Sequence, residues 1–116
     1  MTWTAWNNGK RRPTGAGYGF KVDAVERDRN FEPDWQSITV ELPAALGDVA
    51  VEVNVNKQSF WGDCRELISD GIGRWMLDEG YAPWPKRRPP RFDVAPSGAR
   101  RFRVKALAGA PATPAR

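Results

Sequence analysis

The chain has 116 residues, of which 41% are hydrophobic and 28% charged, a balance typical of a soluble globular domain. No stretch approaches the ~18 consecutive apolar residues of a transmembrane helix, and the first residues lack the basic and apolar regions of a secretory signal peptide. We therefore expect one cytoplasmic α+β domain over residues 1–107, followed by a disordered Ala/Pro-rich tail at 108–116.

Charge is unevenly distributed along the chain. Residues 1–22 carry a net +4, residues 23–80 carry −8 and residues 81–116 carry +8, which together give the overall +4. Two basic ends around an acidic middle predict that the ends form one positive surface. The sequence contains no histidine, which excludes a Ser-His-Asp triad, a Cys-His pair and the usual His-bearing zinc sites.

The first third of the chain predicts loops and then one strand. Residues 1–17 combine an Asn-Gly turn signal with closely spaced glycines, which favours turns, and Trp3 and Trp6 are expected to cover an edge of the core. Residues 18–25 alternate between apolar and polar side chains, as a half-buried strand does. The mixed charges of residues 26–35 indicate a charged connection that is either a solvated loop or a short helix.

Two antiparallel hairpins are expected. Residues 37–42 and 49–55 alternate β-branched and polar side chains on either side of a turn, which is typical of paired strands. The four prolines in residues 82–91 favour an extended path into the second hairpin. That hairpin consists of residues 91–94 and 101–106.

One long helix is predicted between the hairpins, over residues 63–79. Its apolar residues recur at helical spacing, Asp63 is a good N-cap, and Gly80 stands where a C-terminal cap belongs. Cys64 falls on the apolar stripe, so we expect it to be buried rather than reactive. The Gly71-Ile72-Gly73 segment either allows close approach to the sheet or divides the helix in two.

These elements predict an α+β fold of about five antiparallel strands with one main helix packed on the sheet, in the order βββ-α-ββ. A helix with a single apolar stripe needs a sheet to cover that stripe. The sheet is expected to be either open or curled toward a partial barrel.

The second hairpin and the segment before it concentrate positive charge. Alternation sends Arg101, Arg103 and Lys105 to one strand face, where Asp93 alone cannot neutralise them. The opposite, core face is expected to receive Phe92, Val94, Phe102, Val104 and Ala106.

Basic residues interleaved with an aromatic side chain are what backbone contacts and base stacking on nucleic acid require. We therefore expect a non-enzymatic DNA- or RNA-binding module that uses no cofactor and no metal. Its candidate binding residues are Trp84, Lys86, Arg87, Arg88, Arg91, Arg101, Arg103 and Lys105, with Lys10, Arg11 and Arg12 as a flexible arm.

Other interpretations stay open. Cations on edge strands also protect against aggregation. A second interpretation is an adaptor or inhibitor that binds a protein through a Trp-rich surface or the acidic middle, and the basic residues would equally suit an acidic protein partner. Asp34 and Glu52 near successive strands have the outline of a metal-dependent nuclease motif, but Asn54 replaces its lysine. Trp61, at the start of the predicted helix, is expected to form a packing corner.

Overall fold

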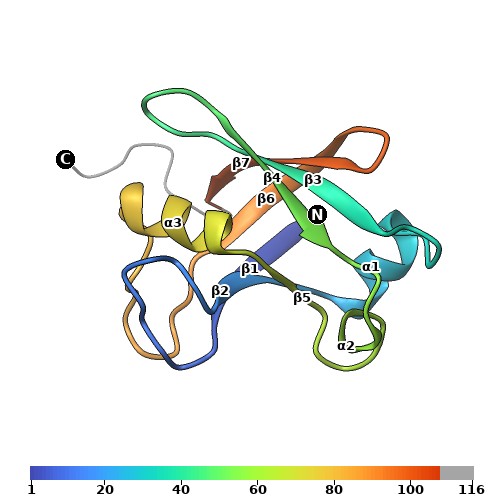
Figure 1. Cartoon of the computed structure of the whole chain (residues 1–116), viewed down its shortest axis with the longest axis horizontal. Coiled ribbons are helices and arrows are strands. Elements are labelled where there is room, and N and C mark those ends of the chain that lie inside the picture. The colour runs from blue at the N-terminus through green and yellow to red at the C-terminus, as the bar shows by residue number, and fades with distance from the viewer. Residues whose placement is uncertain (108–116) are drawn as a thin grey trace.

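The computed structural model of the chain describes residues 1–107, except for the side chain of Ala106 (Figure 1). The tail predicted at 108–116 lies outside the described residues. The described part forms seven strands and three helices. In chain order they are β1 (Thr2–Asn7), β2 (Tyr18–Val22), α1 (Ala24–Asn30), β3 (Ser37–Leu42), β4 (Val49–Asn54), α2 (Gln58–Trp61), β5 (Glu66–Ile68), α3 (Asp70–Asp78), β6 (Arg91–Gly98) and β7 (Arg101–Leu107).

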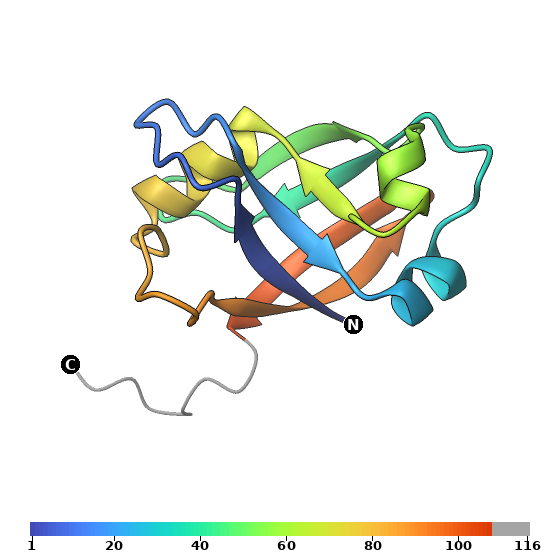
Figure 2. The same cartoon turned by 90° about the horizontal axis from the view of Figure 1, so that it is seen from below.

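The seven strands belong to one sheet, in the order β4-β3-β7-β6-β1-β2-β5. Neighbouring strands are antiparallel, except that β3 and β7 run parallel. The sheet curls until its edge strands β4 and β5 come into contact, which makes a nearly closed barrel (Figure 2). The predicted α+β class is confirmed, and of the two alternatives left open for the sheet the structure shows the curled one. The predicted count of five strands and the order βββ-α-ββ are wrong.

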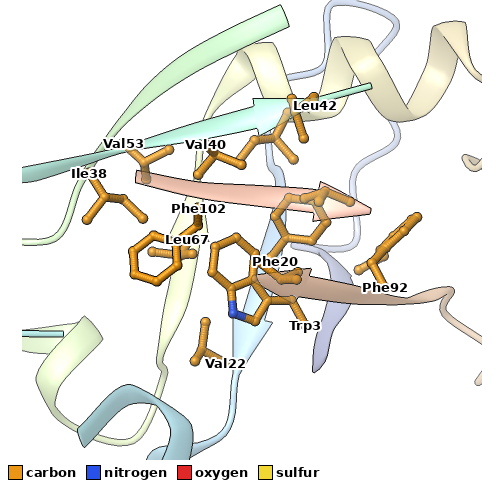
Figure 3. Close-up of a cluster of buried hydrophobic side chains, with 14 of the residues drawn as sticks. Trp3, Phe20, Val22, Ile38, Val40, Leu42, Val53, Leu67, Phe92 and Phe102 are labelled. Atoms are coloured by element: carbon orange, nitrogen blue, oxygen red, sulfur yellow. The ribbon is translucent and has the colours of Figure 1, made fainter. Parts of the chain in front are cut away.

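The inside of the barrel is filled with aromatic and branched side chains around Trp3 (Figure 3). Trp3 is 0% exposed, and its ring centroid lies 5.4 Å from that of Phe20 and 5.6 Å from that of Phe102. A buried aromatic of this size removes roughly 200 Å² from water, worth about 5 kcal/mol at ~25 cal/mol per Å². Of the five residues assigned to the core face of the second hairpin, Phe92, Val94, Phe102 and Val104 are buried as predicted.

Strand β1 replaces the loop expected at the start of the chain. Trp3 and Ala5 alternate toward the core, and the strand pairs with both β2 and β6. The pattern is hard to detect in the sequence because one of its two core residues is an alanine. The Asn-Gly signal is correct but local: it marks the turn after β1, where Gly9 has a φ of +98°.

The long helix predicted over residues 63–79 is wrong. The segment contains β5 and then α3, and Leu67 pairs with Phe20 of β2 instead of continuing a helical stripe. Ser69 rather than Asp63 caps α3, because its hydroxyl accepts a hydrogen bond of 3.1 Å from the Gly71 amide. Cys64 lies in the connection before β5 and is exposed, not buried.

Two parts of the helix prediction hold. The Gly71-Ile72-Gly73 segment lies within α3 without dividing it, and its Gly71 approaches Val51 of β4 closely. Gly80 has a φ of +81°. On either side of it, the Glu79 amide donates to the Trp75 carbonyl and the Tyr81 amide donates to the Met76 carbonyl, which caps the end of the helix. Within residues 1–107, no helix combines the length and the apolar character needed to cross a membrane.

Helix α1 occupies the connection predicted at 26–35, and β2 ends at Val22 rather than at residue 25. Arg27 of α1 is only 9% exposed and donates 3.0 Å hydrogen bonds to the carbonyls of Phe60 and Gly62. Its guanidinium also lies 5.3 Å from the centre of the Trp61 ring, whose Nε1 donates to the Val55 carbonyl. Trp61 therefore forms a packing corner, as predicted.

Both predicted hairpins are present. β3 and β4 pair in continuous register. β6 extends through Gly98, further than predicted, and pairs with β7 with two irregularities in register. The structure then places the β3–β4 hairpin beside β7 through the parallel pairing, which the local sequence pattern does not encode.

Candidate functional site

A pocket of about 650 Å³ lies where two loops meet at one end of the barrel. One loop joins β1 to β2 (residues 8–17) and the other joins α3 to β6 (residues 79–90). Figure 2 shows both loops on the same side of the molecule, in blue and in orange. The volume falls within the ~300–1,000 Å³ typical of pockets that bind small ligands.

The lining of this pocket is aromatic and cationic. Its aromatic residues are Trp6, Tyr18 and Trp84, and its charged residues are Arg11, Lys86 and Arg87. The remaining lining residues are alanine, glycine, proline and asparagine, so the lining contains no carboxylate to neutralise the three cations. We call this site the aromatic–basic pocket. It is suited to an anionic ligand that has a flat, stackable part.

The loop between α3 and β6 presents Lys86 and Arg87 at the tip of a turn. The Arg88 amide donates a 2.9 Å hydrogen bond to the Pro85 carbonyl, and the Ala5 amide of β1 holds the Pro90 carbonyl at 2.8 Å. Arg87 itself has a φ of +64°, a left-handed conformation that is unfavourable for a side chain of this kind. The turn is therefore anchored at its ends and strained at the residue that faces the pocket.

The β1–β2 loop is tied to the barrel in a similar way. The Asn8 amide donates to the Gly17 carbonyl at 3.0 Å, and the Asn7 side chain donates to the Lys10 carbonyl at 3.0 Å. The segment from Lys10 to Arg12, predicted to be a flexible arm, is instead part of this hydrogen-bonded loop. Arg11 lines the pocket, whereas its two basic neighbours are exposed beside it.

A glycine pair fixes the β1–β2 loop against α3. Gly15 lies directly on Gly73, and a Cβ atom built on Gly73 would overlap the Gly15 carbonyl oxygen and stand 2.7 Å from its carbonyl carbon. Only two glycines allow the backbones to approach this closely. The pocket wall that carries Arg11 therefore depends on the position of α3.

Tyr18 borders the pocket but belongs to the buried core of the barrel. The residue is 1% exposed, and its hydroxyl oxygen has no hydrogen-bond partner within residues 1–107. Its ring meets that of Trp84 edge-on, with centroids 5.9 Å apart. The indole nitrogen of Trp3, in the core, is a second buried polar atom without a partner in the described residues.

Two arginines of β7 predicted to bind nucleic acid are paired with acids. Arg101 donates to Glu41 at 2.7 Å and Arg103 to Asp48 at 2.6 Å, with Glu41 also 3.7 Å from Arg103. The expectation that Asp93 is the only acid near this face is wrong, because the parallel pairing brings β3 beside β7.

The ion pairs of β7 also shift two pKa values. The Arg101 guanidinium, with the Ser97 hydroxyl second, lowers the pKa of Glu41 from its ordinary value, and hydrogen bonding to Asp48 raises that of Arg103. Lys105 of the same strand is exposed and makes no ion pair with the part of the chain that the structure describes.

The predicted basic residues are spread along β6 and β7 as well as around the pocket, and Lys105 falls between the β7 residues that pair with Asp93 and Val94. Arg101 pairs with Gly98, seven residues along β6 from Arg91, which at ~3.3 Å per residue is about 23 Å. Arg88 and Arg91 are exposed and close in sequence to the pocket turn. Trp84, Lys86, Arg87 and Arg11 are the predicted residues that the structure brings together, and Trp6 and Tyr18 are lining residues that the prediction of a binding site missed.

The residues on which the other interpretations depend also have definite places in the structure. All six tryptophans lie in the described residues, two of them buried and four half-buried. Within residues 1–107, no group of three or more acids or cysteines is placed to hold a metal, and Glu52 accepts a hydrogen bond from Ser37 on the outside of the barrel. No protein-family model, curated protein or solved structure matches the chain significantly.

Proposed function

We propose that the protein is a non-enzymatic module that binds single-stranded DNA or RNA in the aromatic–basic pocket. The observation that carries the proposal is the lining: Trp6 and Trp84 stand with three cations around one cavity without an acid. Phosphates would lie on the cations, and an unstacked base would lie on a tryptophan. Stacking of a base on an aromatic side chain contributes about 1–3 kcal/mol, and a base inside a duplex is not available for it.

The distribution of ion pairs supports the pocket, rather than β7, as the main phosphate-binding site. Arg11, Lys86 and Arg87 make no ion pair with the described residues, so a phosphate can approach them without displacing a carboxylate. Arg101 and Arg103 would first have to release Glu41 and Asp48. The exposed cations beside the pocket, Lys10, Arg12, Arg88 and Arg91, can extend the contact along a strand.

The experiment is a fluorescence-anisotropy titration of labelled oligo-dT and oligo-rU, with a matched duplex, at about 50 and 200 mM salt. The Arg11→Ala/Lys86→Ala/Arg87→Ala variant removes three pocket charges. It is expected to reduce the salt slope by about 2, because each phosphate contact on a single strand contributes ~0.7. Binding of the duplex is expected to be weaker than that of the single strands.

The matched control is Arg101→Ala/Arg103→Ala/Lys105→Ala, which removes the same charge from β7. We expect this variant to keep most of the affinity and slope of the wild type. Loss of binding in the control but not in the pocket variant would mean that the phosphates bind to β7 instead. Absence of single-strand binding at low salt would refute the proposed function itself.

A further inference from the structure

The outer face of β1 leads away from the aromatic–basic pocket along the barrel. Trp3 and Ala5 point into the core. The alternate residues Thr2, Thr4 and Trp6 therefore take the outer face. Figure 2 looks onto this face, with β1 in dark blue between β2 and β6 and no helix of the described residues in front of it. Since Trp6 also lines the pocket, a strand bound there has a direct way out along β1.

The next position on this face carries a cation. Thr4 lies two residues from Trp6 along β1, or about 7 Å, which is of the order of the distance between successive phosphates of an extended single strand. Thr4 pairs directly with Arg91 of β6 and, on its other side, with Lys21 of β2. Residues that pair in this way have neighbouring side chains on the same face of a sheet. A strand that leaves Trp6 along β1 therefore meets this row of three.

Of the two basic residues in the row, Arg91 is the one that a phosphate can reach without displacing a carboxylate. Lys21 is paired with Glu66 at 3.3 Å, and the Glu66 side chain is only 14% exposed. Arg91 is exposed and makes no ion pair with the part of the chain that the structure describes. The neighbouring Thr4 adds a hydroxyl, a group that often bonds to phosphate oxygens.

The attraction for phosphates ends one row further along β1. Thr2 pairs with Asp93 of β6, which is exposed, and the Thr2 amide donates 3.2 Å hydrogen bonds to both carboxylate oxygens of Glu26. Lys105 of β7, near Asp93, and the terminal ammonium on the Val94 carbonyl do no more than offset these two charges. A phosphate on this row would meet an exposed carboxylate and no excess of positive charge.

We propose that a single strand leaves the aromatic–basic pocket over Trp6 and crosses the outer face of the barrel at Arg91, which binds the next phosphate, and that its path ends before Asp93. This inference rests on the proposed function and adds the route and length of the bound strand to it. The pocket, Trp6 and the Thr4–Arg91 pair give a bound length of about three nucleotides, at about 7 Å for each step along β1. The contact at Arg91 is indifferent to base sequence, because phosphates carry no sequence information.

The first test is a competition titration at about 50 mM salt, in which unlabelled oligo-dT of about two to eight nucleotides displaces a labelled octamer. The affinity is expected to rise steeply up to about three or four nucleotides, and beyond that length only with the number of ways in which a strand can be placed. A steep rise that continues to the octamer would overturn the proposed end of the path. An affinity that is already level from the dinucleotide onward would overturn the contact at Arg91.

The Arg91→Ala variant separates the path from the pocket. It is expected to weaken binding of the hexamer by about 2- to 5-fold, the range of an exposed ion pair, and to lower the salt slope by ~0.7. The dinucleotide, which the pocket can hold alone, should bind as before, and Arg91→Lys should keep most of the affinity for the hexamer because it keeps the charge. The matched control is Arg29→Ala on α1, an exposed arginine that also makes no ion pair within residues 1–107 and that should leave every length unaffected.

The Asp93→Asn variant tests the end of the path. Removing this exposed carboxylate is expected to tighten binding of the octamer by about 2-fold and to leave the dinucleotide unchanged. No gain for the octamer would mean that Asp93 does not limit the bound length, which would overturn that part of the inference.

Two results with Arg91→Ala would overturn the route itself. They are an unchanged affinity for the hexamer and an equal loss for the hexamer and the dinucleotide, since the second would place Arg91 in the pocket. In either case binding of the strands would still support the proposed function. If no oligonucleotide binds, both the inference and the proposed function fail.

Discussion

Replacing Gly73 by alanine tests the contact that connects α3 to the pocket wall. The new Cβ would stand 2.7 Å from the Gly15 carbonyl carbon, where ordinary contacts are about 3.5–4.0 Å. The obstacle is backbone on both sides, so the helix or the loop must move by roughly 1 Å. Overpacking of this kind costs about 1–3 kcal/mol, against at most ~1 kcal/mol gained in helix propensity.

We therefore expect Gly73→Ala to lose about 1–2 kcal/mol of unfolding free energy, or about 4–8 °C in melting temperature for a domain of this size. Urea denaturation and calorimetry measure the two quantities. The variant should also bind oligo-dT less well, because the loop that moves carries Arg11.

Gly71→Ala is the matched control in the same helix. Its Cβ would meet Val51 Cγ2 at 3.0 Å, and a half-buried valine side chain can shift by a few tenths of an ångström. We expect a change within about 0.5 kcal/mol, because the clash and the gain in helix propensity offset each other. If the two alanine variants are equally stable, the backbone contact between Gly15 and Gly73 does not hold α3 to the loop.

Three further predictions concern single side chains. Arg87→Gly should raise the unfolding free energy by about 1 kcal/mol, because glycine relieves the strain of a φ of +64°, and it should weaken oligonucleotide binding. The control is Arg88→Gly, which should not stabilise the chain because Arg88 has no positive φ. Arg27→Met should cost about 2–3 kcal/mol in urea denaturation by leaving two carbonyls without their donor, with exposed Arg29→Met nearly neutral. The lowered pKa of Glu41 means that its pairing stabilises the fold above the ordinary value of 4.5 and that this contribution is lost as pH falls through the folded pKa. Glu41→Gln should therefore have a lower urea midpoint than the wild type at neutral pH, and the difference should vanish in acid.

The strands of the two hairpins could be predicted because their alternation is carried by large residues. Val40 and Val53, like Phe102 and Val104, leave little doubt about which face is buried. The helix could not be placed, because the spacing of apolar residues around Leu67 fits both a helix and a strand. Pairing with Phe20, some 47 residues away, decides between them, and no local pattern reports it.

The candidate site, like the fold, could be predicted from the sequence only in part. Lys86, Arg87 and Trp84 could be found from charge and composition because they stand in one proline-rich segment, and Arg11 because it stands in the basic run of residues 10–12. The acids that neutralise Arg101 and Arg103 could not, because they arrive through the one parallel pairing of the described sheet. Tyr18 stands in the strand predicted at residues 18–25, but the place of that strand beside the pocket depends on loops from two distant parts of the chain.

The parallel pairing of β3 with β7 has a consequence for the order of folding. β7 is the strand that joins the β3–β4 hairpin to the rest of the described sheet. During synthesis, that hairpin is complete once Asn54 has been added, yet the edge of β3 has no partner until β7 follows about 50 residues later. The nascent chain therefore carries an open strand edge throughout that interval, and an aggregation inhibitor or chaperone would act most strongly then.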